Sequence, residues 1–87
     1  MIDNVEQQRF ELSENGLLVF ANYRHSENRY VLTHVEADPG LRGTGAAGRL
    51  MQAIADHARA NALKLTPRCS YALVWMKRHP EQSDLIA

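Results

Sequence analysis

A short run of small residues near the middle of the chain constrains the fold more than any other feature. Residues 41–50 read LRGTGAAGRL, and the second half of this run continues directly into an apolar-periodic segment. A turn that enters a helix leaves several backbone N–H groups without partners at the positive end of the helix dipole. Gly43 and Gly45 lack the Cβ atoms that would keep a ligand's oxygens away from the backbone. The sequence therefore predicts an anion site here, with phosphate as its usual occupant.

The segments before this turn predict an antiparallel meander. Residues 1–8 are polar, and we expect them to be loose. Runs rich in apolar, aromatic and β-branched residues then predict three strands, at residues 9–12, 17–25 and 29–35. Short clusters of Ser, Asn, Glu and Gly separate the strands and are typical of hairpin turns. Consecutive strands joined by such short turns pair in antiparallel fashion.

The segments after the turn predict a crossover unit and a second helix. In residues 44–60 apolar residues recur at helical spacing: Ala47, Leu50, Met51, Ile54 and Ala58. Residues 63–66 predict a fourth strand, which a right-handed crossover places parallel to the third. Ser70 is a favourable N-cap for a second helix over residues 71–79, which the next proline ends. Residues 81–87 read as a polar tail with a weak apolar end, Leu85-Ile86.

Composition limits the size, compartment and partners of the protein. With 87 residues the chain predicts one domain spanning residues 1–87. Its ten basic and ten acidic side chains cancel, which argues against a nucleic-acid partner. No apolar run approaches the ~20 residues that span a bilayer, and the opening residues do not resemble a secretory signal. A single cysteine suits a reducing compartment, so we expect a cytoplasmic protein without a membrane or metal partner.

Several residues along the chain together resemble a known family. The stretch Arg42-Gly43-Thr44-Gly45-Ala46-Ala47 fits the pattern Arg/Gln-x-x-Gly-x-Gly/Ala, which resembles the acetyl-CoA pyrophosphate loop of the GNAT N-acetyltransferase superfamily. Further residues are similar to the small, single-domain members: His34, the turn Pro67-Arg68-Cys69, Tyr71 and the run Arg78-His79-Pro80-Glu81. The resemblance covers nearly the whole chain, from the second predicted strand to Pro80.

The resemblance implies a fold and a cofactor. The fold is an α/β, reduced acetyltransferase core of order β-β-β-α-β-α, an antiparallel meander with one parallel βαβ crossover. The loop residues implied to bind the CoA diphosphate are Arg42, Gly43, Thr44, Gly45, Ala46 and Ala47. The family often reads His-Thr-Glu-Val-Pro before the loop, whereas here the proline comes one place later, and Leu41 replaces a more usual aromatic residue. These departures concern the local shape of the loop. The chain also lacks the extra helices and C-terminal strands that normally help to bind the acceptor.

His34 and Cys69 match positions that the small family is thought to use near the acetyl thioester. Alternation along the third strand places Tyr30, Leu32 and His34 on one face. Both His34 and Cys69 are expected near the carboxyl ends of two parallel strands, where ligands bind in open α/β sheets. A Cys–His pair within hydrogen-bond reach would activate the thiol or deprotonate an acceptor amine, and a helix N-terminus beside Arg68 favours the thiolate. The alternatives are a small buried hydrophobe for Cys69 and an exposed surface residue for His34.

Three functional hypotheses follow. The first is an acetyl-CoA-dependent N-acetyltransferase with an unidentified amine acceptor, which acts directly with His34 as base or through an acetyl-Cys69 intermediate. The second is a non-catalytic CoA-binding or protein-interaction module, and the third is a structural domain whose Gly-rich loop is coincidental. Because the chain is short, we expect self-association or a partner protein to complete the acceptor site. Tyr71 and Trp75 are expected in the core, and Arg49 on a solvated face from which some basic residues reach the cofactor's phosphates.

Overall fold

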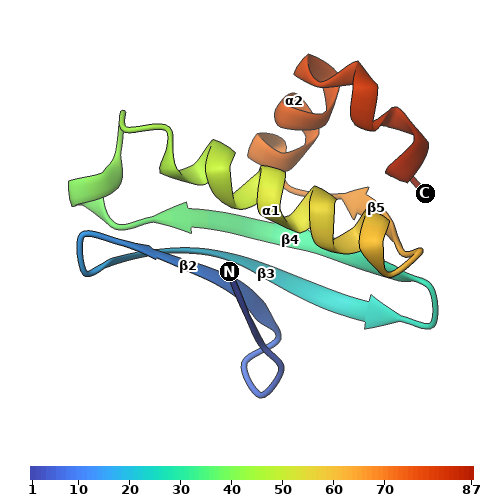
Figure 1. The fold of residues 1–87 in the computed structure, drawn as a ribbon, viewed down its shortest axis with the longest axis horizontal. Coiled ribbons are helices and arrows are strands. Elements are labelled where there is room, and N and C mark those ends of the chain that lie inside the picture. Colours follow the sequence, from blue (N-terminus) through green and yellow to red (C-terminus); the bar gives the residue numbers. More distant parts are fainter.

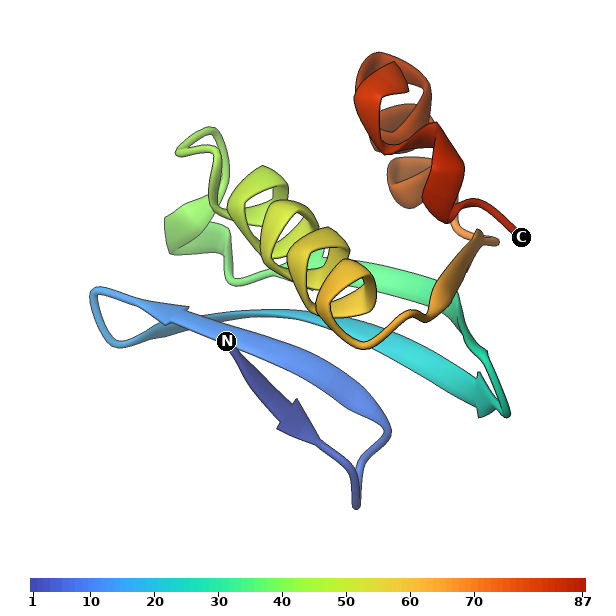
Figure 2. The same cartoon turned by 45° about the vertical axis from the view of Figure 1, so that its right-hand side comes forward.

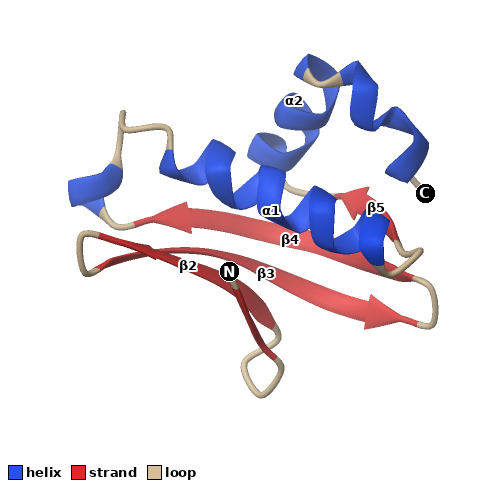
Figure 3. Ribbon diagram, in the orientation of Figure 1, coloured by secondary structure: helices blue, strands red, loops and turns tan.

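The computed structural model describes all 87 residues as one five-stranded sheet with helices (Figures 1 and 3). Along the chain the elements are β1 (Ile2–Asn4), β2 (Arg9–Glu14), β3 (Leu17–Ser26), β4 (Arg29–Ala37), the 3-10 helix η1 (Pro39–Leu41), α1 (Ala46–Ala60), β5 (Lys64–Pro67), α2 (Ser70–Arg78) and the 3-10 helix η2 (Pro80–Leu85). This confirms the predicted α/β class and element order, and it adds one strand at the N-terminus.

The strands lie side by side in sequence order, from β1 to β5. The first four pair in antiparallel fashion, whereas β4 and β5 pair in parallel through the crossover that contains α1. The β2–β3 hairpin closes on Asn15 and Gly16, both with positive φ (51° and 74°). A two-residue turn of this kind matches the twist of the paired strands. The predicted meander and the parallel crossover are therefore confirmed.

The N-terminal segment is ordered by pairing, so the prediction that residues 1–8 are loose was wrong for β1. Ile2, Asp3 and Asn4 pair with the neighbouring strand β2. Asp3 accepts a hydrogen bond of 2.6 Å from the Tyr23 hydroxyl, and the Asn4 amide donates one of 3.1 Å to Glu11. Hydrogen bonds from polar side chains therefore keep β1 in place. Their partners lie on other strands, so the polar sequence of residues 1–8 does not by itself reveal them.

The core lies between one face of the sheet and α1, which runs across that face (Figure 2). The side chains of Leu50, Met51 and Ile54 on α1 are completely buried. Phe10 and Leu32 are completely buried on the sheet. The helix α2 packs beside α1 near β4 and β5, and the opposite face of the sheet has no helix on it (Figure 2). Neither α1 nor α2 has the length and apolarity that a membrane-crossing helix needs.

A β-bulge on β4 changes which residues face the core. Tyr23 pairs with Leu32 and Asn22 pairs with His34, so Thr33 is an extra residue in the ladder. One extra residue reverses the alternation beyond it. Val35, beyond the bulge, consequently packs against the core. The prediction that His34 shares a face with Leu32 was wrong for this reason.

The C-terminal residues form part of the core and are not the polar tail that was predicted. Within η2 the side chains of Gln82 and Leu85 are buried, at 7% and 4% exposure. Ile86 forms a parallel bridge with Leu65, and the Ala87 N–H donates to the Leu65 carbonyl at 2.9 Å. The segment thus covers the outer edge of β5, which a short strand would otherwise leave open.

Candidate functional site

The Gly-rich loop forms a turn that its own residues stabilise. Leu41, only 3% exposed, anchors the loop in the core. The Thr44 hydroxyl donates to the Leu41 carbonyl at 2.5 Å and accepts a hydrogen bond of 3.3 Å from the Ala46 N–H. Gly43 and Gly45 have φ values of 78° and 85°, a region that strains residues with a Cβ. Gly45 is the N-cap of α1, so both glycines are required by the backbone itself.

Free backbone donors gather at the start of α1. The N–H groups of Gly45, Ala47 and Gly48 make no hydrogen bond within the chain, because the first turn of a helix has no acceptors for them. The first turn of α1 contains no acidic residue, so no carboxylate of that turn competes for these donors. The positive end of the α1 dipole lies at these same N–H groups. This geometry can hold an anion.

Two arginines lie at this loop. Arg42 is exposed and joins no ion pair of the chain. Arg49 donates from Nε and Nη2 to the two oxygens of Glu14, both at 2.7 Å, and this pairing holds the pKa of Glu14 below its usual value. The third nitrogen, Nη1, lies 3.1 Å from the place that a Cβ on Gly45 would take. The sequence analysis placed Arg49 on a solvated face and did not anticipate its ion pair. The partner, Glu14, lies 35 positions earlier in the chain, so the residues around Arg49 do not indicate it.

The sheet opens between β4 and β5 beside this loop. The ladder between the two strands ends where Leu32 meets Pro67. The N–H groups of Arg68 and Cys69 then both donate to the Leu32 carbonyl, at 2.9 and 3.2 Å. Beyond this point β4 continues to Ala37 without β5 beside it, which leaves a free strand edge. The carboxyl ends of parallel strands that separate in this way are a common ligand position in open sheets.

Cys69 lies where β5 passes into α2, and it is the N-cap of the helix. Its half-buried thiol accepts a hydrogen bond of 3.3 Å from the Ala72 N–H. The prediction of Ser70 as the cap was wrong, although Ser is ordinarily the better capping residue. The backbone explains the difference, because the hydrogen bond to Leu32 holds Cys69 in an extended conformation while Ser70 is already helical.

His34 lies on the face of the sheet opposite to α1. Its Nε2 lies 3.1 Å from a carboxylate oxygen of Glu36, and its side chain is 54% exposed. No hydrogen bond joins it to Cys69, whose thiol is engaged by α2. The two residues flank the same opening of the sheet through their backbones, since Cys69 binds Leu32 and His34 follows two residues later. The bulge therefore separates the side chains that the sequence was expected to bring together.

The first turn of α2 lies close to the first turn of α1. A Cβ built on Gly48 would lie 3.7 Å from the Tyr71 hydroxyl and 3.8 Å from Trp75 Nε1. Trp75 is buried as predicted, at 6% exposure, whereas Tyr71 is 40% exposed and was wrongly expected in the core. Burial of its hydroxyl end raises the pKa of Tyr71, and the charge of Arg78 opposes this shift. Tyr71 therefore remains a neutral hydrogen-bond donor at physiological pH.

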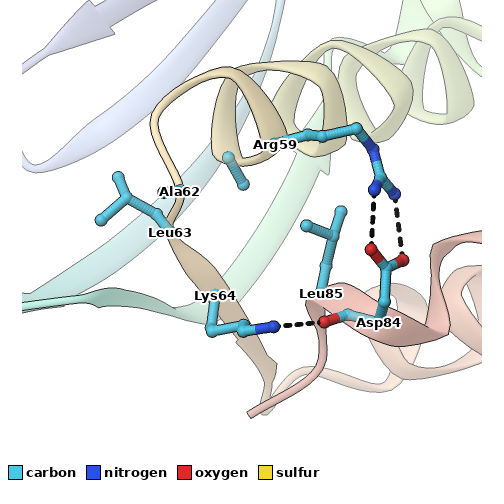
Figure 4. A pocket seen from close by; sticks show the side chains of 7 residues that line it. Arg59, Ala62, Leu63, Lys64, Asp84 and Leu85 are labelled. Carbon is cyan, nitrogen blue, oxygen red and sulfur yellow. Dashed lines mark hydrogen bonds and ion pairs between the residues drawn. The ribbon is translucent and has the colours of Figure 1, made fainter.

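A pocket of about 230 Å³ lies at the other end of α1 (Figure 4). Arg59 donates to both oxygens of Asp84, at 2.7 and 3.1 Å, and Lys64 donates to the Asp84 carbonyl at 2.6 Å. The basic groups are thus held by the chain's own acceptors. A helix of fifteen residues is about 22 Å long, so this pocket lies far from the loop. We assign it to the junction between α1, β5 and η2.

Comparisons with known proteins agree with this arrangement. A family model described as GCN5-related N-acetyltransferase matches residues 9–85. The chain is also similar in fold to the NMR solution structure of a GCN5-like protein from Staphylococcus aureus, with a TM-score of 0.63. The two sequences are 20% identical over 92% of this chain and 89% of the other. The similarity in structure thus extends over nearly the whole of both chains.

Proposed function

Because this chain belongs to the GCN5-related N-acetyltransferase family, we propose that it transfers an acetyl group from acetyl-CoA to an amine. The observation that supports this most directly is the convergence of donors at the start of α1. Three unpaired N–H groups, Nη1 of Arg49 and the unpaired Arg42 all lie at one loop. Such a set matches the two adjacent charges of a diphosphate better than it matches a single carboxylate.

The residues offer a place for each part of the cofactor. The diphosphate would bind at Arg42, Gly43, Thr44, Gly45, Ala46 and Ala47. The arm that carries the thiol would follow the free edge of β4 beyond Leu32, where backbone groups face no β5 strand. Bound acetyl-CoA supplies an activated acyl thioester. The opening beside Leu32 would place that thioester near Cys69, whose N–H binds the Leu32 carbonyl.

Two routes for the acetyl group remain compatible with these positions. In the first, Sγ of Cys69 forms a bond to the acetyl carbon and CoA leaves as its thiolate. The amine then forms the C–N bond and the C–Sγ bond breaks, while the proton released by the amine returns to a thiolate. In the second, the amine attacks the thioester directly and His34 accepts its proton, with Glu36 stabilising the imidazolium. The Cys69 route requires no contact between Cys69 and His34.

The competing proposal is a CoA-binding module without transferase activity. One observation favours it, because the structure does not join Cys69 and His34 by a hydrogen bond. Such a module would bind CoA as tightly as an enzyme but would fail to acetylate any amine.

Calorimetry with CoA and an acetylation assay test these proposals in turn. We expect CoA binding in the micromolar range and transfer to some member of a mixed panel of amines and peptides. Arg42→Glu should weaken CoA binding strongly, because it places a carboxylate beside the diphosphate. Arg24→Glu is the matched control, since Arg24 is also exposed but lies on β3. Absence of CoA binding in the unmodified protein would reject both proposals, and binding without transfer would favour the module.

A further inference from the structure

Exposed apolar side chains gather in two short segments of the chain. The exposed large ones are Met1, Ile2 and Val5 at β1, Tyr71, Leu73 and Val74 in α2, and Ile86 at the C-terminal end. Single exposed apolar residues are ordinary on a protein surface, whereas grouped ones indicate a surface that binds another protein. Tyr71 borders the candidate site already described, but the other residues of the two groups have no role in that site.

The exposed side of α2 is both apolar and positively charged. Leu73 and Val74 are 42% and 43% exposed, and Lys77 and Arg78 follow them one helical turn later. Neither basic side chain joins an ion pair within the chain. Residues 57–80 contain five of the ten basic side chains and no acidic one, although the chain as a whole has no net charge. We call Leu73, Val74, Lys77 and Arg78 the α2 patch.

The segment at β1 is apolar and negatively charged. Ile2 and Val5 are 65% and 69% exposed, the highest values among the large apolar side chains. Glu6 is exposed and joins no ion pair, and residues 1–8 contain no lysine or arginine. The Gln8 N–H donates to the Val5 carbonyl at 3.2 Å, so this turn is already ordered and loses little entropy on binding. We call Ile2, Val5 and Glu6 the N-terminal patch.

The two patches are complementary in charge, but they cannot meet within one molecule. The strand β1 is one outer strand of the sheet, whereas α2 lies beside β4 and β5 at the other edge (Figure 2). Pairing two α2 patches would bring like charges together, and so would pairing two N-terminal patches. The arrangement that joins opposite charges is a head-to-tail contact between two copies of the chain.

We propose that the N-terminal patch of one copy docks on the α2 patch of a second copy. Because the patches lie at opposite edges, further copies add at either end, in an open chain or a closed ring. A short turn on a nine-residue helix is a small interface, so the association is weak and reversible.

This contact places the second copy close to the candidate site. The helix α2 begins at Ser70, directly after Cys69, so a copy docked on α2 lies within about two helical turns of the opening of the sheet. It thereby contributes to the acceptor site that the short chain leaves incomplete. This consequence rests on the proposed acetyl transfer, whereas the contact itself does not.

Sedimentation of the full chain over a range of concentrations tests the contact. At low salt we expect the average mass to rise with concentration beyond that of a dimer. The association constant should fall about tenfold between about 0.05 and 0.5 M NaCl, because salt screens exposed charges. A mass that stays at the monomer value, or that stops at the dimer, would overturn the proposal.

Charge reversal identifies the two surfaces. Glu6→Lys and Lys77→Glu should each weaken the association about tenfold, because each places like charges against one another. Glu27→Lys is the matched control, since Glu27 is also exposed and unpaired but lies between β3 and β4. The double variant Glu6→Lys/Lys77→Glu should recover most of the association. Absence of this recovery, or stronger association of Lys77→Glu alone, would contradict the head-to-tail contact.

An apolar substitution gives a second readout. Val74→Ala should weaken the association about fivefold, through the loss of buried apolar area between the copies. Ile86→Ala is its control, because Ile86 is 45% exposed but belongs to neither patch. Urea unfolding verifies that every variant is folded. Equal effects of the two substitutions would mean that general surface apolarity, and not the α2 patch, drives the association.

The contact and the proposed function fail in different ways. If the unmodified protein binds CoA in calorimetry and acetylates an amine but stays monomeric, the contact is wrong and the function stands. If it associates as described but binds no CoA, the contact stands and the function is rejected. Where both hold, Glu6→Lys and Val74→Ala should lower the rate of acetyl transfer and leave the affinity for CoA unchanged.

Discussion

At the scale of single residues, Cys69 combines a structural contact with a proposed chemical role. Its thiol accepts the Ala72 N–H as the cap of α2, and it lies beside the opening of the sheet. Cys69→Ser retains an acceptor and supplies a better cap, so the folded state should be unchanged or more stable. Cys69→Ala removes the cap and should cost about 1 kcal/mol. Both variants remove the nucleophile, so on the cysteine route both should lose most of the transferase activity while binding CoA normally.

Urea unfolding, calorimetry and the acetylation assay on these two variants separate the roles. In the unmodified protein, iodoacetamide should alkylate Cys69 and bound CoA should protect it. Full activity in the serine variant, together with a thiol inert to alkylation, would contradict the cysteine route. Direct transfer with His34 as base would then be the better mechanism.

Arg49 is a second residue whose role can be isolated, because α1 carries a matched partner at its other end. Arg49 and Arg59 each bind a carboxylate with two nitrogens, Glu14 and Asp84 respectively. Only Arg49 has its remaining nitrogen at Gly45. Arg49→Gln should therefore weaken CoA binding roughly tenfold, the loss of a charge-assisted hydrogen bond. Arg59→Gln should leave the affinity unchanged, and equal losses in calorimetry would mean that net charge alone explains the effect.

At the scale of elements, the segments with strong periodicity were predicted and those fixed by distant partners were not. Apolar spacing located α1 because its buried face repeats with the helical period. The bulge at Thr33 has no sequence signal, since it arises from the register of two strands. The same applies to η2, where a few buried residues among polar ones give no period. The bulge is the reason that His34 was predicted on the wrong face of the sheet. The missing period in η2 is the reason that the C-terminal segment was predicted to be a tail.

The element η2 should contribute measurably to stability. Leu85 is 4% exposed against the core, so Leu85→Ala should lower the free energy of unfolding by about 2–4 kcal/mol. Ile86 is 45% exposed, and Ile86→Ala should change it by no more than about 0.5 kcal/mol. Urea denaturation of both variants tests the difference. Similar small losses would mean that the segment is a tail after all.

At the scale of the whole molecule, one face of the sheet carries no helix, and this bears on the acceptor. The face holds polar groups already paired with one another, such as Arg9 with Glu11 and His34 with Glu36. The pocket at the far end of α1 is likewise occupied by its own ion pair. Because the chain is short, we expect a second subunit or a partner protein to complete the acceptor site.

Free small amines should accordingly be poor substrates of the monomer. We expect slow acetylation of a simple polyamine in a sample shown to be monomeric by sedimentation, and faster transfer when the chain self-associates or a protein acceptor is present. Efficient turnover of the polyamine by a strictly monomeric sample would contradict this expectation. Calorimetry on the same sample verifies that CoA binding is intact.

Alkaline pH should destabilise the whole molecule, because its buried tyrosines resist ionisation. Burial, together with the hydrogen bond to Asp3, raises the pKa of Tyr23 well above the usual value near 10, and burial also raises that of Tyr30. In the unfolded chain both hydroxyls ionise near pH 10. The stability that arises from this difference is complete below that pH and is lost as the pH rises toward the folded-state values. The free energy of unfolding in urea should therefore be constant between about pH 8 and 9 and fall steeply above 10.

Tyr23→Phe should cost about 1 kcal/mol at neutral pH, through the lost hydrogen bond to β1, and should make the alkaline decline shallower. A decline of equal slope in both proteins would show that Tyr23 is not its source.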